Sequence, residues 1–248
     1  MIPKRIITTW IADPKRDKYQ ERHREMFAHC LTSWLRLMPD YEIVIVTYGS
    51  VIESASFEGD LPHCQWVLER CKEGNFIGAS QWARLWWLHR LGGFFLDADV
   101  EAVKRFDELR GETYVLGHLG NGQNFANNAV MGVEKGHPWL LDQLDYIQKC
   151  DPKHFDFGNE TGPFMVSNLL RRGGWDGRDV DKTVIVPCEN HKVRGGAVSV
   201  TVRRSKVFHP YSYNEHFTPE CLAEDTLAIH HWAASWKPVE EQTQQVWR

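Results

Sequence analysis

The chain has 248 residues, of which 42% are hydrophobic and 25% are charged, a composition typical of one folded domain and not of a disordered chain. Its 29 basic and 33 acidic side chains give a net charge of −4, whereas nucleic-acid-binding proteins usually carry a basic excess. No apolar run reaches the roughly 18 residues of a membrane span, and the start MIPKRIITTW lacks the apolar core of a secretory signal.

Apolar, β-rich runs alternate with longer amphipathic runs along the chain. In chain order we expect a strand at Arg5–Trp10, a helix at His23–Met38, a strand at Tyr41–Thr47, a helix at Ile77–Leu91, strands at Phe94–Leu96, Tyr114–Leu116 and Ala129–Val133, helices at Pro138–Cys150 and Pro163–Arg172, and strands at Thr183–Val186 and Thr226–His231. This alternation predicts an α/β fold in which helices flank a largely parallel sheet. We expect residues 1–248 to form a single domain.

Three short stretches of the sequence carry more detailed expectations. Tyr41–Thr47 (YEIVIVT) is a near-continuous β-branched run, which is typical of a central strand covered on both faces. Gly92-Gly93 ends the preceding helix by supplying a left-handed cap just before the strand at Phe94–Leu96. Val198–Val202 alternates with polar residues and predicts a partly exposed hairpin.

The strongest chemical signal is FFLDADV, residues 94–100. Three apolar residues run directly into Asp97 and Asp99, which we expect at the edge of the sheet where α/β proteins bind ligands. Residues two apart on an extended chain point the same way, and two such carboxylates repel each other unless a cation lies between them. Mg²⁺ and Mn²⁺ prefer carboxylate, water and phosphate oxygens. The pattern therefore indicates a metal site that also suits a diphosphate; the alternative is an acidic turn with solvated carboxylates.

Other polar residues give weaker signals. Arg84 lies on the helix that leads to the aspartates, where it could reach an anionic ligand or, alternatively, cover apolar surface with its stem. A histidine at the end of the last strand could be an extra metal ligand. Because successive strand residues face opposite ways, at most one of His230 and His231 should point at one site, and either could instead be a core residue. Asn128 could bind a sugar hydroxyl or be an ordinary turn residue.

In order along the chain, these segments resemble glycosyltransferase family 32, which includes yeast-type initiating mannosyltransferases and has the clostridial glucosylating toxins as distant relatives. Ala79–Asp99 is similar to the family block A-S-D-x-x-R…L-x-x-x-G-G-x-Y-x-D-x-D. The further similarities are Ile2-Pro3-Lys4 with Trp10, Trp34 with Pro39–Glu42, Asn128-Ala129 with Gly136-His137-Pro138, Thr161-Gly162-Pro163, and His231 with Ser235-Trp236.

The resemblance implies a GT-A fold, with a Rossmann-like nucleotide-binding sheet flanked by helices. It implies a retaining, metal-dependent transfer of a hexose or N-acetylhexosamine from a nucleotide-sugar, with UDP as the expected nucleotide, in surface polysaccharide synthesis. The implied acceptor is a glycan or a lipid-linked oligosaccharide. We expect a cytoplasmic protein without a transmembrane segment or a nucleic-acid partner, in peripheral contact with the inner face of the membrane if the acceptor is lipid-linked.

The resemblance also implies the roles of individual residues. Mn²⁺ or Mg²⁺ would be bound by Asp97, Asp99 and His231, with His230 as the alternative ligand. The implied catalytic residues are Asp97, Asp99 and Arg84. Trp10 would stack on the base, and the full set of implied donor-binding residues is Trp10, Gln81, Arg84, Asp97, Asn128, Ser235 and Trp236.

Three positions depart from the family pattern: Ile7 replaces a histidine, Gln81 an acidic residue and Phe95 a tyrosine. Gln81 and Phe95 leave the identity of the donor sugar open, and these two positions are the basis of a second hypothesis, a non-catalytic sugar-nucleotide or glycan-binding module. A third hypothesis is a DxD-dependent phosphohydrolase, whose motif usually lies near the N-terminus. Loops that read an acceptor vary most, and we expect them within Glu189–Pro219.

Overall fold

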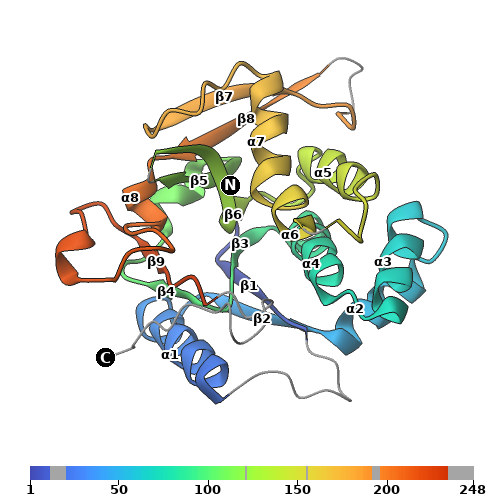
Figure 1. Ribbon diagram of the computed structural model, residues 1–248, viewed down its shortest axis with the longest axis horizontal. Coiled ribbons are helices and arrows are strands. Elements are labelled where there is room, and N and C mark those ends of the chain that lie inside the picture. The colour runs from blue at the N-terminus through green and yellow to red at the C-terminus, as the bar shows by residue number, and fades with distance from the viewer. Residues whose placement is uncertain (12–20, 121, 155, 192–195, 234–248) are drawn as a thin grey trace.

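A seven-stranded sheet lies at the centre of the computed structural model, which describes residues 1–11, 21–120, 122–154, 156–191 and 196–233. The strand order is β2-β1-β3-β6-β5-β8-β7 (Figure 1). Five of these strands run in one direction, and β6 and β7 run against them. The strands are β1 Arg5–Trp10, β2 Glu42–Thr47, β3 Gly93–Leu96, β5 Tyr114–Gly120, β6 Gln123–Val133, β7 Lys182–Pro187 and β8 Ala197–Arg203.

Helices cover both faces of this sheet. They are α1 Glu21–Leu37, α2 Tyr48–Phe57, α3 Pro62–Glu73, α4 Phe76–Leu91, α5 Trp139–Ile147, α6 Phe157–Glu160, α7 Pro163–Arg172 and α8 Ser205–Phe208, with 3-10 turns η1 Asp107–Gly111 and η2 Pro219–Cys221. Helices α2 to α7 contribute to one apolar core, and α1 and α8 contribute to another. Within the described ranges, no helix combines the length and the apolarity that crossing a bilayer requires.

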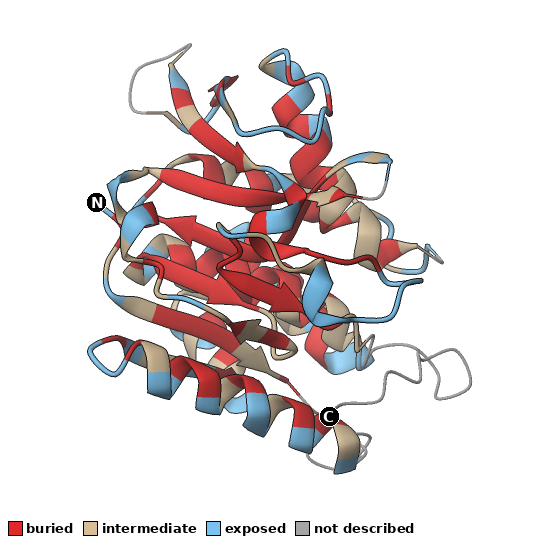
Figure 2. Cartoon of the chain, turned by 90° about the vertical axis from the view of Figure 1, so that its left-hand side faces the viewer, coloured by how far each residue is buried: buried red, intermediate tan, exposed pale blue. Residues whose placement is uncertain are grey.

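Alternate residues of the central strands belong to these two cores. Ile7 and Phe95 pack with α2 to α7, whereas Ile6 and Phe94 pack with α1 and α8, and all four side chains are fully buried. Figure 2 shows the inner strands as a buried layer beside α1, whose outer face is exposed. A strand covered by helices on both faces needs apolar residues at every position, which explains the continuous run before the aspartates.

The sequence predicted several elements well and two environments badly. β1 and α7 have the predicted bounds. The prediction that Tyr41–Thr47 is a central strand is wrong: β2 is an edge strand that pairs only with β1, and its Ile45 is 39% exposed. The prediction of a partly exposed hairpin at Val198–Val202 is wrong about exposure, because β8 lies between β5 and β7 and buries Val200 and Val202.

A second, two-stranded sheet was not predicted. It pairs β4, Val100–Ala102, with β9, Ala228–His230, in antiparallel register. The register places Val100 opposite His230. This short ladder brings the end of the described chain to the edge of the main sheet where the two aspartates lie.

Candidate active site

Two glycines turn the chain from α4 into β3. Gly92 and Gly93 have φ values of 66° and 126°, a region that residues with a Cβ rarely adopt. A Cβ on Gly93 would lie 2.7 Å from the carbonyl oxygen of Arg5 on β1. This close approach lets β3 start immediately after the helix and end at the aspartates.

A turn, and not an extended strand, brings Asp97 and Asp99 together. The N–H of Val100 donates to the carbonyl of Asp97 at 3.0 Å, while the N–H of Asp97 donates to the carbonyl of Ala129 on β6 at 2.9 Å. Asp97, Asp99 and His230 offer ligand atoms that lie within 4.8 Å of one another. We call these three residues the aspartate cluster. The expectation that the two carboxylates converge because they alternate along an extended strand is therefore wrong; the turn itself makes them converge.

The adjacent histidines face different carboxylates. The Nε2 atom of His230 lies 3.4 Å from Oδ1 of Asp99, and Nε2 of His231 lies 3.0 Å from Oε2 of Glu101. The backbone N–H of His231 donates to the carbonyl of Asp99 at 2.9 Å, which fixes the register beyond β9. The structure thus groups His230, the alternative ligand of the sequence analysis, with the aspartates and places the first choice, His231, beside Glu101.

Arg84 is the centre of a buried polar network. Its Nη2 donates to Oδ1 of Asp97 at 2.5 Å and its Nη1 donates to Oε1 of Gln81 at 3.1 Å. Asn128 donates to the same Gln81 oxygen at 3.3 Å, and the guanidinium lies 4.5 Å from the ring centroid of Phe95. Arg84 is only 5% exposed, so it does not simply cover apolar surface. Gln81 and Phe95, two departures from the family pattern, both contact this arginine.

Electrostatics distinguish the two aspartates. Burial raises the pKa of Asp97, and the nearby Arg84 guanidinium offsets this only in part. Burial also raises the pKa of Asp99, but the His230 imidazole outweighs it and lowers that pKa to about 2. Burial lowers the pKa of His230, but the carboxylate of Asp99 outweighs burial and raises it above the ordinary value. Asp99 is therefore the member of the cluster that ionises most readily.

Trp10 lies at the same edge of the sheet. The ladder pairs Ile7 of β1 with Phe95 of β3 in parallel, so Trp10 at the end of β1 and Asp97 after β3 emerge on the same side. The Trp10 ring stacks on Phe27 of α1, with centroids 4.7 Å apart and planes 13° apart. It is half-buried, and a planar aromatic surface of this kind suits a nucleotide base.

The Thr-Gly-Pro segment packs against the arginine network. A Cβ on Gly162 would lie 3.2 Å from Oδ1 of Asn128 and 3.2 Å from Nε2 of Gln81. Glycine at this position therefore lets the start of α7 approach the two amides. Ser235 and Trp236, the remaining donor-binding residues expected from the sequence, lie outside the described residues.

Trp232, directly after the two histidines, contacts the aspartate cluster. Its φ of 56° is left-handed, which is unusual for a bulky residue and is often found at functional sites. The bend sets the Trp232 ring against the His230 ring, with centroids 4.1 Å apart. Its Nε1–H donates to the carbonyl of Tyr211 at 3.1 Å. The only sequence signal was an aromatic residue directly after two histidines.

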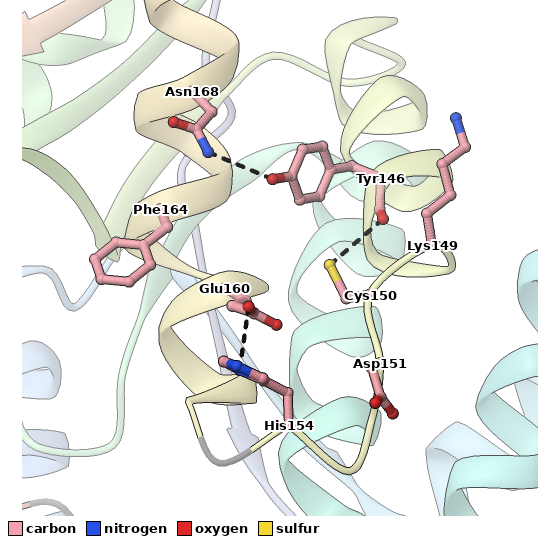
Figure 3. Close-up of a pocket in the computed structure, with 8 residues that line it drawn as sticks. All are labelled: Tyr146, Lys149, Cys150, Asp151, His154, Glu160, Phe164 and Asn168. Carbon is pink, nitrogen blue, oxygen red and sulfur yellow. Dashed lines mark hydrogen bonds and ion pairs between the residues drawn. The ribbon is translucent and has the colours of Figure 1, made fainter.

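A cavity of about 360 Å³ lies between α5, α6 and α7 (Figure 3). Its lining contains none of the aspartate cluster and consists of Tyr146, Lys149, Cys150, Asp151, His154, Glu160, Phe164 and Asn168. In this lining, Nδ1 of His154 lies 3.1 Å from Oε1 of Glu160. Helix α6 links it to the arginine network, because the carbonyl of Gly158 accepts a hydrogen bond from Gln81 at 3.5 Å.

Comparison with known proteins defines the class. Residues 24–116 match the family model described as "Glycosyltransferase sugar-binding region containing DXD motif", a segment that includes Arg84, Asp97 and Asp99. The chain therefore carries a glycosyltransferase DXD region, and the expected DXD motif is confirmed.

Two individual proteins illustrate the similarity. The chain is 29% identical over 171 residues to inositol phosphoceramide mannosyltransferase 3 of Schizosaccharomyces pombe; the alignment covers 67% of this chain and 44% of the relative, so the chain spans less than half of that protein. The solved structure of PaToxG glycosyltransferase is similar with a TM-score of 0.53 and 18% identity, over 69% of this chain and 68% of that one. The expected α/β fold of the GT-A type is confirmed.

Proposed function

We propose that this protein is a retaining, metal-dependent glycosyltransferase of family 32. It moves a hexose or N-acetylhexosamine from a nucleotide-sugar, UDP-linked by first choice, to a glycan acceptor in surface polysaccharide synthesis. The observation that carries the proposal is the convergence of Asp97, Asp99 and His230 within 4.8 Å beside the buried Arg84, which donates to Asp97. Carboxylates suit a hard cation, and a guanidinium suits a phosphate.

The donor atoms of the aspartate cluster fit Mn²⁺ or Mg²⁺. Two carboxylates and one imidazole supply part of an octahedral shell, and the diphosphate and water would complete it. The Nδ1 atom of His230 is buried and has no hydrogen-bond partner among the described residues, while Nε2 faces Asp99. We propose His230 as the ligand in place of His231. A bound cation would supply Lewis-acid stabilisation of the departing diphosphate.

The residues around the cluster would hold the donor. Arg84 orients the Asp97 carboxylate and supplies positive charge next to it. We propose that Trp10 stacks on the base and that Gln81 and Asn128 contact the sugar, since both amides lie on the Arg84 network. We propose that Ser235 and Trp236, which lie outside the described residues, also bind the donor.

Retention is proposed to occur by a front-face route. A double displacement needs a carboxylate nucleophile beside the sugar. The carboxylates of Asp97 and Asp99 are paired with Arg84 and His230, which suits metal binding better than attack on carbon. Departure and attack on the same face of the sugar would need no further nucleophile.

The acceptor and the setting of the reaction are also proposals. A glycan or lipid-linked oligosaccharide would be read by the segment Glu189–Pro219, of which residues 192–195 lie outside the described residues. We place the reaction in the cytoplasm, at the inner face of the membrane if the acceptor is lipid-linked. Residues 1–248 would act as one domain, because the main sheet takes strands from Arg5–Trp10 to Ala197–Arg203.

One observation favours a second candidate, a non-catalytic sugar-nucleotide-binding module. The Gln81 oxygen accepts from both Arg84 and Asn128, so it is less available to a sugar hydroxyl than an acidic side chain would be. The phosphohydrolase hypothesis is not pursued, because the segment that contains the aspartates matches a glycosyltransferase region.

The test is donor turnover. The protein is incubated with Mn²⁺, Mg²⁺ or EDTA and a panel of UDP-sugars and GDP-mannose, and release of the nucleoside diphosphate is measured. We expect slow, metal-dependent release from one donor and none in EDTA. Metal-dependent UDP binding without release from any donor would favour the binding module, and neither binding nor release would reject both candidates.

A further inference from the structure

A second set of possible ligands lies on the other side of the β4–β9 ladder. His29 of α1, Glu101 of β4 and His231, directly after β9, offer ligand atoms within 4.8 Å of one another. We call these three residues the histidine cluster. None of these three residues belongs to the donor site proposed above, and they come from three separate parts of the chain. We propose that the histidine cluster is a second metal site, which binds Zn²⁺ independently of the aspartate cluster.

The distances fit a tetrahedral ion. The Nε2 atom of His29 lies 3.1 Å from Oε2 of Glu101, and Nε2 of His231 lies 3.0 Å from the same oxygen. Tetrahedral Zn²⁺ with bonds of about 2.0–2.1 Å separates its ligand atoms by about 3.3 Å. Small side-chain movements would therefore admit the ion, and water would fill the remaining coordination.

The surroundings of His231 support a ligand role. Its Nδ1 atom lies 3.3 Å from the hydroxyl of Tyr211, and the Phe217 ring packs edge-on against the imidazole, with centroids 6.2 Å apart. Metal-binding histidines usually hydrogen-bond through the second ring nitrogen, which fixes the ring orientation. The His231 side chain is only 3% exposed and that of Glu101 is 22% exposed. The ring therefore faces Glu101 before any ion binds.

The donor types predict the metal. Two imidazoles and one carboxylate favour Zn²⁺ over Mg²⁺, whereas the aspartate cluster offers two carboxylates and has a guanidinium 2.5 Å from one of them. A bound ion would tie α1 to the short ladder. Because Glu101 follows Asp99 by two residues and His231 follows His230 directly, this link would hold the backbone that carries the aspartate cluster.

Metal binding to the purified full chain tests the proposal. We use Asp97→Asn as the parent, because it weakens the aspartate cluster and leaves the histidine cluster intact. Metal-free protein is titrated with Zn²⁺ in a calorimeter and with Co²⁺ in a spectrophotometer. We expect one equivalent of Zn²⁺, the visible bands of tetrahedral Co²⁺, and a rise of roughly 5 °C in the unfolding midpoint with excess Zn²⁺.

Two added substitutions should remove these signals. His29→Ala changes a side chain that is 55% exposed, and Glu101→Gln keeps the shape while removing the charge, so both should fold. The matched control is His154→Ala, which breaks another histidine–carboxylate pair of 3.1 Å (Figure 3). Among the described residues this pair belongs to neither group of possible metal ligands, so the variant should bind Zn²⁺ like the parent. No tetrahedral Co²⁺ signal in the parent, or Zn²⁺ binding unchanged by both His29→Ala and Glu101→Gln, would overturn the proposal and leave an ordinary hydrogen-bonded cluster.

Discussion

The aspartate cluster and the histidine cluster are built on the same short ladder, yet they suit different ligands. Each takes a carboxylate from the β4 side and a histidine from the β9 side. What differs is the helix that packs against each one. Helix α4 brings Arg84 to the first, and α1 brings His29 to the second. The ladder therefore determines which side chains lie close together, and the residue that the neighbouring helix adds determines which ligand each cluster suits.

The largest expected effect is loss of turnover when the aspartate cluster loses charge. Asp97→Asn and Asp99→Asn should lower kcat by at least ~10²-fold, because charge that builds on the leaving diphosphate is no longer stabilised. The fold should persist, since asparagine keeps the shape of aspartate and an oxygen that can accept from Arg84 or from the N–H of Ala233. The measurement is donor turnover with Mn²⁺, with the exposed Asp60→Asn as a matched control. Full activity in either variant would contradict the site assignment.

A substitution at Arg84 tests the contribution of helix α4 to the aspartate cluster. Arg84→Lys keeps the charge, but one ammonium cannot reach both Asp97 and Gln81 as the planar guanidinium does. We expect kcat/KM to fall on the order of 10- to 100-fold, with a smaller effect than in Arg84→Gln. Arg90→Lys is the control on the same helix, because that arginine pairs with Glu58. Equal activity of Arg84→Lys and the unchanged protein would show that the fork geometry is irrelevant.

Trp10 tests the proposed nucleotide-binding end of the site. Trp10→Ala should weaken UDP binding roughly 5- to 150-fold, because stacking of a base on an aromatic ring is worth about 1–3 kcal/mol. Trp10→Phe should lose less. Calorimetry with UDP and Mn²⁺ measures the change, and Phe57→Ala, at an 89% exposed aromatic residue, serves as the control. Unchanged affinity in Trp10→Ala would remove the stacking role.

The smallest expected effect is a contrast between the two adjacent histidines. In the metal-free protein, Asp99 outweighs burial and raises the pKa of His230 above 6.5, whereas burial outweighs Glu101 and lowers the pKa of His231 below 6.5. NMR titration should show His230 protonating first as the pH falls. Both histidines titrating together would contradict the contrast between the clusters.

The same contrast predicts opposite effects on stability. His230 stabilises the fold below pH 6.5, and this contribution is lost as the pH rises through its folded pKa; His231 has the reverse sign, costing stability as the pH falls below 6.5. Unfolding midpoints should therefore be measured from pH 5 to 8. The midpoint of His230→Gln should lie below that of the unchanged protein at low pH, and the difference should shrink as the pH rises. The midpoint of His231→Gln should rise relative to that of the unchanged protein as the pH falls. Parallel curves for both variants would refute the assignment.

Local patterns made part of this site predictable. Asp97, Asp99 and Arg84 could be identified because a buried helix, a glycine pair and an apolar run lead directly to the aspartates. The choice between His230 and His231 could not be made. This choice depends on the register between β4 and β9, two strands of three residues each. Such short strands leave little periodicity in the sequence, and the contact between His231 and Glu101 joins residues 130 positions apart.

Topology was equally hidden at the edges of the sheet. A β-branched run such as Tyr41–Thr47 predicts a strand. Whether that strand is central depends on which other strands pair with it, and in the order of the described strands β2 lies at the end, beside β1. The histidine cluster was missed for a similar reason. His29 lies on a helix that packs on β4, and nothing local to that helix points to Glu101.

A crystal structure with UDP and Mn²⁺, with the ion located by anomalous scattering at the manganese edge, tests the central claim most directly. We expect one Mn²⁺ bound by Asp97, Asp99 and His230, with the diphosphate completing its coordination and Arg84 beside it. Mn²⁺ and UDP bound elsewhere, with no ion between the two aspartates, would contradict it.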